Sequence, residues 1–76
     1  MLIEQNTDTQ VLLYALGKHI RKLRMGKNIT QTELAMECDM DKASLSKIES
    51  GQVNISFHTL YRLSIGLKVS IKDLIP

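Results

Sequence analysis

Hydrophobic residues recur at steps of three and four along most of this chain, which is the spacing that gives an α-helix one apolar face. The first such stretch starts near Thr9, with Asp8 or Thr9 as its cap, and carries Leu13, Leu16, Ile20 and Leu23. It is expected to end at Lys27-Asn28, because Asn tolerates the left-handed backbone that closes many helices. The pattern therefore predicts an amphipathic helix over about residues 9–27.

Two short helices joined by a tight turn are predicted between Ile29 and Gly51. Thr30 and Glu33 have the spacing of a capping box, in which each side chain bonds the backbone N–H of the other. Asp41 is a good cap for the second helix. The inward residues of the two helices are Leu34, Ala35, Cys38, Leu45 and Ile48. Cys38-Asp39-Met40 leaves room only for a turn, and Asp39 tolerates the left-handed backbone expected at its sharpest point.

Two more helices complete the pattern. Ser56 is the expected cap of a helix from Phe57 to about Leu67, whose inward stripe is Phe57, Leu60, Leu63 and Leu67. Ser70 caps a last short helix that contains Ile71, Leu74 and Ile75. Residues 1–8 have weak periodicity and fit a frayed arm, a helix extension or a subunit contact. The prediction is one all-α domain over residues 1–76, with five helices around an aliphatic core and residues 1–8 as an N-terminal arm.

Composition narrows the class of protein. The 76 residues are 43% hydrophobic and include no Trp, which allows one modest core without disulfides or metals. The single cysteine excludes an internal disulfide and fits a reducing cytoplasm. No apolar run approaches the ~20 residues that cross a bilayer, and MLIEQNTDTQ lacks the basic residue of a secretory signal. We therefore expect a soluble cytoplasmic protein.

Enzymatic and metal chemistry find little support in the sequence. His19, His58 and Cys38 do not have the spacing of a metal site. There is no nucleophile–base signature and no Gly-rich phosphate loop. Cys38 has the helical spacing of a small buried hydrophobic residue, so a nucleophilic role is not expected. The expectation is a protein that is not an enzyme and needs neither cofactor nor metal.

Positive charge is concentrated on the first predicted helix. The net charge is only +2, yet no acidic residue occurs between Asp8 and Glu33. Five basic residues occupy that interval: Lys18, Arg21, Lys22, Arg24 and Lys27. Such a run is typical of nucleic-acid binding and also of a solvated helix face, so charge alone leaves both interpretations open.

Three motifs in order along the chain carry a family resemblance. They are Leu16-Gly17-Lys18-x-Ile20-Arg21-x-Leu23-Arg24, Thr30-Gln31-x-Glu33-Leu34-Ala35 and Ser44-x-Ser46-x-Ile48-Glu49-x-Gly51. Together with Asn54 and Leu67-Lys68-Val69, they resemble the XRE-type, lambda-repressor-like helix-turn-helix domains over about residues 16–74. The chain departs from the family at Asn28 and Asp39, where Gly is common, and at Ile55, where Pro is frequent. The resemblance implies a five-helix DNA-binding domain.

The resemblance also implies residue roles. Arg24 and Glu49 match a buried structural ion pair, and Gln31 matches a residue that bonds a DNA phosphate and supports the recognition helix. In this motif the second helix lies in the major groove, where a lysine can donate to guanine and an alanine methyl can pack on thymine. The expected DNA-contacting residues are Gln31, Thr32, Lys42, Ala43, Ser44, Ser46, Lys47 and Asn54. The alternative for the two lysines is solubilising surface, and for the two serines polar filler.

The expected function is sequence-specific binding of double-stranded DNA by a small prokaryotic or phage transcription regulator. One module contacts few base pairs, so a homodimer on a palindromic operator is expected. The expected dimer surface is Val69, Ile71, Leu74 and Ile75, with Met1-Leu2-Ile3 as a second candidate patch. The alternative is that the C-terminal residues pack on their own core.

A rival function belongs to another class. The chain would then be a protein-interaction module, such as an antitoxin that masks a toxin or a bridging coactivator. The outward face of the predicted recognition helix has lysines and no aromatic residue, which favours DNA over a protein hot spot. RNA is disfavoured because the narrow major groove of A-form RNA excludes a helix.

Overall fold

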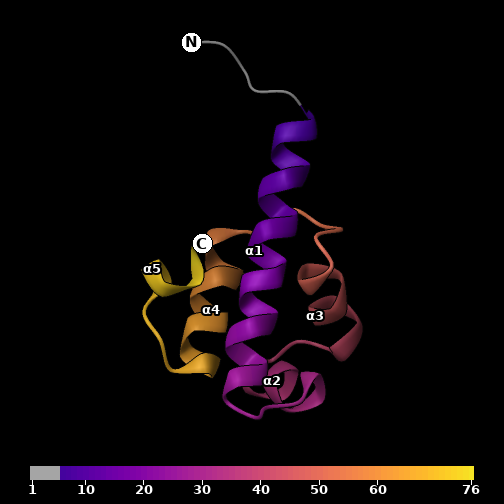
Figure 1. Ribbon diagram of the computed structural model, residues 1–76. Helices are drawn as coiled ribbons and strands as arrows, with labels where there is room; N and C mark the ends of the chain where they lie inside the picture. The colour runs from indigo at the N-terminus through magenta and orange to yellow at the C-terminus, as the bar shows by residue number, and fades with distance from the viewer. Residues whose placement is uncertain (1–5) are drawn as a thin grey trace.

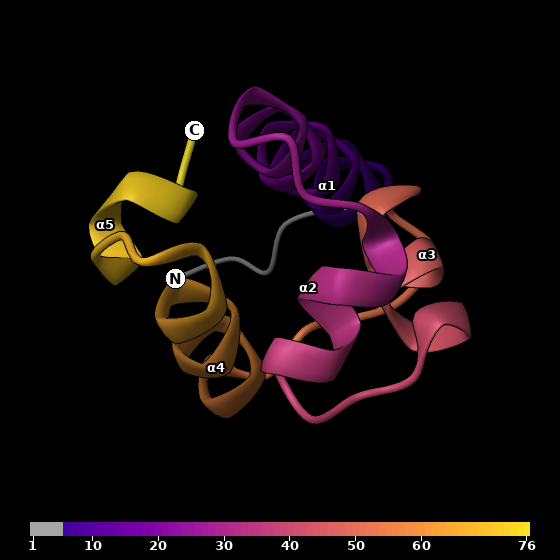
Figure 2. The ribbon, with the colours of Figure 1, turned by 90° about the horizontal axis from the view of Figure 1, so that it is seen from below.

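The computed structural model describes residues 6–76, and this part of the chain contains helices and no strand. The helices are α1 (Asn6–Gly26), α2 (Gln31–Glu37), α3 (Lys42–Glu49), α4 (Phe57–Leu67) and α5 (Ile71–Leu74). In Figure 1, α1 stands between α3 on one side and α4 and α5 on the other, and α2 lies across its C-terminal end. Seen from below, α2 lies between α3 and α4 (Figure 2). The predicted all-α fold of five helices is confirmed.

The first helix begins earlier than its apolar pattern predicted. α1 starts at Asn6, three residues before Thr9, so residues 6–8 form a helix extension, one of the three possibilities that the sequence left open for residues 1–8. Met1-Leu2-Ile3 lies outside the described residues. The first turns of α1 project beyond the other helices (Figure 1), and Val11 and Leu12 are exposed there. The apolar spacing did not reveal this start, because turns that project beyond the other helices have no need for a buried apolar face.

One aliphatic core joins all five helices. Its buried members are Leu16, Ile20, Leu34, Ala35, Cys38, Leu45, Ile48, Leu63, Leu67 and Leu74. Cys38 packs as a small hydrophobic residue, as predicted, and burial raises the pKa of its thiol. The core thus brings the helix-turn-helix pair against α1 on one side and α4 on the other.

Phe57 was wrongly assigned to this core. It is 69% exposed, because its spacing fits two stripes of α4. It lies three residues from the partly buried Leu60 and four from Tyr61, and the structure places it with the exposed residues. Phe57, Tyr61 and Ile65, at steps of four, form an exposed apolar row that we name the α4 stripe.

Side-chain caps fix the starts of α2 and α3. Thr30 Oγ1 accepts from the Glu33 N–H at 3.1 Å, and Glu33 Oε1 accepts from the Thr30 N–H at 2.8 Å, which confirms the capping box. Asp41 Oδ1 accepts from the Ser44 N–H at 2.7 Å, which confirms the second cap. The hydrogen bonds from Ser44, through its side chain and its backbone, lower the pKa of Asp41. Both starts are therefore set by residues close in sequence.

The later caps follow the same logic with one difference. Ser56 Oγ accepts from the Thr59 N–H at 3.1 Å and caps α4, as predicted. Ser70 has the backbone of a cap, but its hydroxyl donates to Asp73 Oδ2 at 2.9 Å and accepts no backbone N–H. Ser70 therefore precedes α5 by position without capping it by a side-chain bond.

The predicted turn residues adopt left-handed backbone. Asn28 has φ 58° after α1, and Asp39 has φ 56° between α2 and α3. Gly51 has φ 77° after α3, and a Cβ there would lie 2.8 Å from Tyr14 Cα. Only glycine meets both demands at position 51, the backbone angle and the close approach of α1.

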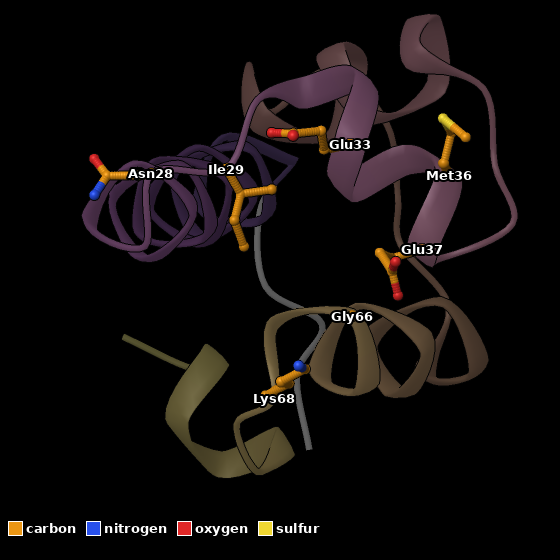
Figure 3. A pocket seen from close by; sticks show the side chains of 7 residues that line it. All are labelled: Asn28, Ile29, Glu33, Met36, Glu37, Gly66 and Lys68. Atoms are coloured by element: carbon orange, nitrogen blue, oxygen red, sulfur yellow. The ribbon is translucent and has the colours of Figure 1, made fainter.

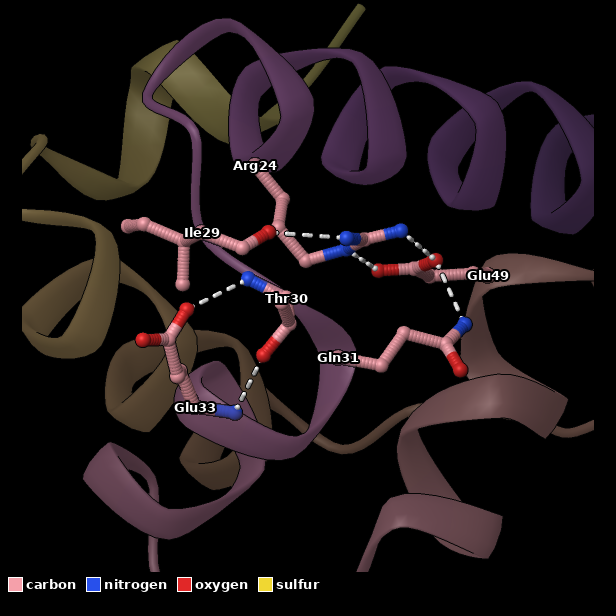
Figure 4. Close-up of polar contacts among 6 residues, drawn as sticks. All are labelled: Arg24, Ile29, Thr30, Gln31, Glu33 and Glu49. Atoms are coloured by element: carbon pink, nitrogen blue, oxygen red, sulfur yellow. Dashed lines mark hydrogen bonds and ion pairs between the residues drawn. The ribbon is translucent and has the colours of Figure 1, made fainter.

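A buried ion pair fastens α3 to α1. Arg24 Nε donates to Glu49 Oε2 at 2.7 Å and Arg24 Nη2 to Glu49 Oε1 at 3.1 Å (Figure 4), with the two residues 8% and 6% exposed. Arg24 Nη1 also donates to the Ile29 carbonyl at 2.8 Å and so holds the loop before α2. At Gly17 a Cβ would lie 2.4 Å from the Ile48 carbonyl oxygen, so α1 and α3 meet backbone to backbone. The predicted ion pair is present and joins these helices.

Glu49→Ala should therefore leave the buried guanidinium of Arg24 without its carboxylate partner. We expect the free energy of unfolding to fall by about 3–5 kcal/mol, the cost of breaking a fully buried pair, as measured by urea denaturation. Glu37→Ala, which removes an exposed carboxylate from α2, is the matched control and should change stability by less than about 0.5 kcal/mol. Wild-type stability in Glu49→Ala would contradict this role for the pair.

Candidate nucleic-acid interface

α3 divides into a buried face and a solvent face. Leu45, Ile48 and Glu49 are buried. The solvent face gathers five of the residues expected to contact DNA: Lys42, Ala43, Ser44, Ser46 and Lys47. Neither lysine has a salt-bridge partner within residues 6–76. The structure thus presents two cations, two hydroxyls and a methyl group from one helix.

Gln31 connects this helix to α2. Its Nε2 donates to Glu49 Oε1 at 2.9 Å (Figure 4), so Arg24, Gln31 and Glu49 form one network across α1, α2 and α3. Gln31 was expected to support α3, and its hydrogen bond to Glu49, the last residue of α3, is a contact of this kind. The side-chain amide has a second N–H and a carbonyl oxygen that remain available to another partner.

A polar hollow of about 390 Å³ opens beside this network, between α1, α2 and α3. Its lining consists of Arg21, Arg24, Gln31, Ser46, Glu49 and Ser50. Arg24 and Glu49 neutralise each other, which leaves Arg21 as the uncompensated charge of the lining. Within residues 6–76, Arg21 has no hydrogen-bond or ion-pair partner. A free guanidinium, an amide N–H and the Ser46 hydroxyl together suit a phosphate group.

Arg21 was not among the residues singled out for DNA contact. The sequence placed it in the basic run of the first helix and in the first motif of the family resemblance, without a role of its own. Its position one turn before Arg24 was the available signal, because residues three apart lie on neighbouring parts of one helix face. The run itself divides in the structure: Arg24 is buried, Arg21 lines the hollow, and Lys18 lies over the Tyr14 ring at 5.4 Å from its centroid.

The two other expected contacts lie outside α3. Thr32 is exposed in the first turn of α2, next to Gln31. Asn54 is exposed in the loop after α3 and lines a different hollow with Tyr14 and Gln52. The expected set is therefore a group on α3, with Gln31 and Thr32 on α2 and with Asn54 in the loop that follows α3.

A separate hollow of about 380 Å³ lies between α2 and α4 (Figure 3). Glu33, Met36 and Glu37 of α2 contribute to its lining, with Lys68 at the end of α4. The hydrogen bonds from the Thr30 backbone N–H and hydroxyl lower the pKa of Glu33, which keeps that carboxylate charged. Two carboxylates beside one lysine repel phosphate, so this hollow is not part of the nucleic-acid interface.

The expected dimer residues differ in their availability. Leu74 is fully buried in the core of its own chain and has no surface for a second subunit, so its assignment was wrong. Ile75 is 51% exposed, and Val69 and Ile71 are half-buried. The α4 stripe, on the helix next to α5, is a more extensive exposed apolar surface than this group.

No cluster of three or more His, Cys, Asp or Glu side chains in residues 9–76 is arranged to hold a metal ion. None of the helices in this part of the chain combines the length and apolar character required to span a membrane.

A helix-turn-helix family and two control proteins share much of this sequence. The helix-turn-helix family model matches residues 20–74. Control protein C.BamHI of Bacillus amyloliquefaciens is 38% identical over 60 residues, which cover 78% of this chain and 74% of that protein. Control protein C.MunI of Mycoplasma sp is 34% identical over 59 residues, covering 76% and 80%.

Solved structures agree in fold. The restriction-modification controller protein C.AhdI from Aeromonas hydrophila has a TM-score of 0.80 at 29% identity, covering 82% of this chain and 94% of that chain. The clp gene regulator ClgR from C. glutamicum has a TM-score of 0.80 at 32% identity, covering 83% and 82%. With the match over residues 20–74 and the exposed face of α3, these similarities show that the chain belongs to the XRE-type helix-turn-helix family, as a sequence-specific DNA-binding transcription regulator.

Proposed function

We propose that this regulator binds a palindromic operator as a homodimer, with the N-terminal half of α3 in the major groove of each half-site. The observation that carries the proposal is the division of α3. Its inner face is fixed to α1 and α2 through Glu49, while Lys42, Ala43, Ser46 and Lys47 are exposed on the outer face. A recognition helix needs both properties, a rigid mount and free polar side chains at its N-terminal end.

The proposed base contacts come from the start of α3. Lys42, its first residue, can donate to O6 and N7 of guanine, and Ala43 can pack its methyl group on a thymine methyl. Ser46 can donate or accept and therefore distinguishes bases weakly. Lys47, one turn further along, reaches either a base or a phosphate.

The proposed phosphate contacts surround this group. Gln31 can donate its second amide N–H, and Arg21 can donate from the hollow next to it. Ser44 and Thr32 are exposed in the first turns of α3 and α2, where their hydroxyl groups can donate to phosphate oxygens. Asn54 would meet the backbone beyond the other end of α3. Such contacts position the protein, while the base contacts select the sequence.

The proposed dimer follows from the size of the site. A single module contacts too few base pairs to find one operator in a genome, and a two-fold dimer places two recognition helices on half-sites about 10 bp apart. We propose that the α4 stripe provides the main subunit contact, with Val69, Ile71 and Ile75 beside it. Burying an exposed apolar row is the usual source of subunit affinity.

The names of the relatives suggest the biological setting. C.BamHI and C.MunI are control proteins, and C.AhdI is named as a restriction-modification controller. We propose a comparable regulator in the cytoplasm of a prokaryote or encoded by a phage, whose operator occupancy follows its own concentration. The proposed function consists of binding alone, with no catalytic step, metal or cofactor.

Selection from a random-sequence duplex library at moderate salt tests this function. The protein should enrich a palindrome whose half-sites lie about one helical turn apart. Enrichment of a single, asymmetric half-site would contradict the dimer and leave the DNA-binding role. Failure to enrich any sequence, with only salt-sensitive binding, would contradict the function and favour a protein-interaction module.

Lys42→Ala should relax the preference at one base step. The expected loss of discrimination is about 1–3 kcal/mol at that step, because a specific lysine–guanine contact is removed. The measurement is the affinity for the selected operator and for each of its single-base-pair variants. An equal loss of affinity on every duplex would show that Lys42 meets only phosphate.

Arg21→Ala should weaken binding to all sequences alike. Loss of one phosphate contact should reduce the slope of log affinity against log salt by about 0.9. Lys22→Ala is the matched control, because it removes an exposed positive charge from the next residue of α1 that does not line the hollow. Gln31→Ala should also weaken all sequences alike, although it disturbs Glu49 as well. A salt slope in Arg21→Ala equal to that of Lys22→Ala would contradict the phosphate role.

A further inference from the structure

α4 touches the end of α2 at two successive turns. At Gly66 a Cβ would lie 2.6 Å from Cys38 Sγ and 3.0 Å from Leu34 Cδ1, and Figure 3 shows this part of α4 facing α2. One turn earlier, Cys38 Sγ donates to the Arg62 carbonyl at 3.3 Å. Because Gly66 has no side chain of its own, the side chains of Leu34 and Cys38 pack directly on the backbone of α4, which makes α4 a firm support for the segment that follows α2.

The Arg62 side chain reaches from this support to the turn between α2 and α3. Its Nη2 donates to the carbonyl oxygen of Asp39 and lies 3.7 Å from Asp39 Oδ2. The Asp39 carboxylate is fully exposed, so water screens the attraction between the two charges. The bond to the carbonyl is therefore the contact that fixes geometry. It acts on a residue with φ 56°, a backbone angle that side chains with a Cβ disfavour.

This turn determines where α3 begins. Two residues after Asp39, Asp41 caps the helix by accepting the Ser44 N–H, and Lys42 is the first helical residue. The other end of α3 is held independently, through the bonds of Glu49 to α1 and α2. The recognition helix is thus held in place at both ends, and the position of its N-terminal end, which is proposed to read DNA, depends on the turn.

We infer that Arg62 is a positioning residue for base recognition: by holding the Asp39 carbonyl it sets the place of Lys42. Arg62 acts through the turn and contacts no base itself. Without its donor, the first turn of α3 gains freedom while Arg21 and Gln31, on α1 and α2, keep their positions. The consequence for DNA rests on the proposed function, whereas the consequence for the turn does not.

Hydrogen exchange of the free protein tests the turn without DNA. Arg62→Met removes the donor and keeps a long apolar side chain, and the Ser44 amide should exchange several-fold faster than in the wild type. The Thr59 amide, held by the equivalent cap of α4, is the internal control and should not change. Unchanged exchange at Ser44, or equal acceleration at both amides, would overturn the inference, since the second result would indicate a merely structural role.

Binding to single-base-pair variants of the selected operator tests the consequence for recognition. Arg62→Met should reduce discrimination at the base pairs read from the start of α3 by at least about fivefold, the lower range of one specific contact. Its salt slope should equal that of the wild type, because no phosphate contact is lost. Arg62→Lys retains a donor and should keep most of the discrimination, and Lys22→Met controls for the lost charge.

The possible outcomes separate the two claims. Uniform weakening on all variants, with relative preferences unchanged, would overturn the positioning role of Arg62. A wild-type protein that selects no operator would instead overturn the proposed function, while the exchange result at Ser44 would still decide whether Arg62 holds the turn.

Discussion

The arrangement of α1, α2 and α3 depends on one buried hydrogen-bonded ion pair. A guanidinium and a carboxylate lose much hydration on burial, and only complete bonding offsets that loss. Arg24 bonds Glu49 twice and the Ile29 carbonyl once, and Glu49 accepts a further bond from Gln31. Within residues 9–76, whose side chains the structure describes, no buried side-chain nitrogen or oxygen lacks a hydrogen-bond partner. Because the apolar core is small, its packing and these directional hydrogen bonds together fix the orientation of α1, α2 and α3.

Local chemistry made most of the fold predictable. The caps at Thr30, Asp41 and Ser56 are marked by residues within three positions, and the left-handed turn at Asp39 follows from its place between two helices. Errors arose where exposure depends on distant packing. Phe57 fits a buried and an exposed stripe of α4 equally well in the sequence. The first turns of α1 project beyond the other helices, so their residues need not form an apolar face that a sequence pattern could reveal.

The candidate site was predictable where it follows from helical period. The outward residues of α3 could be identified because its inward residues were recognised first. Arg21 and Arg62 were not identified. The only sequence signal for Arg21 was its position one turn before Arg24, because the hollow that it lines is formed by three helices. Arg62 has no such signal, because the backbone carbonyl that accepts from it lies 23 residues away in the sequence. Leu74 was misassigned for the related reason that an apolar residue in a short helix looks the same whether it faces its own core or another subunit.

The positions of the charged residues imply that salt affects the stability of the fold and the affinity for DNA to different extents. Among the side chains of residues 9–76 there are two ion pairs, and of these Arg24–Glu49 is buried, where mobile ions screen it little. Contacts with a polyanion weaken steeply as salt rises, because the release of counterions that accompanies binding becomes less favourable in a more concentrated salt solution. A rise in ionic strength would therefore lower operator occupancy while the domain stays folded. In a regulator of this kind, ionic strength would change the affinity for DNA without a change in the folded state of the protein.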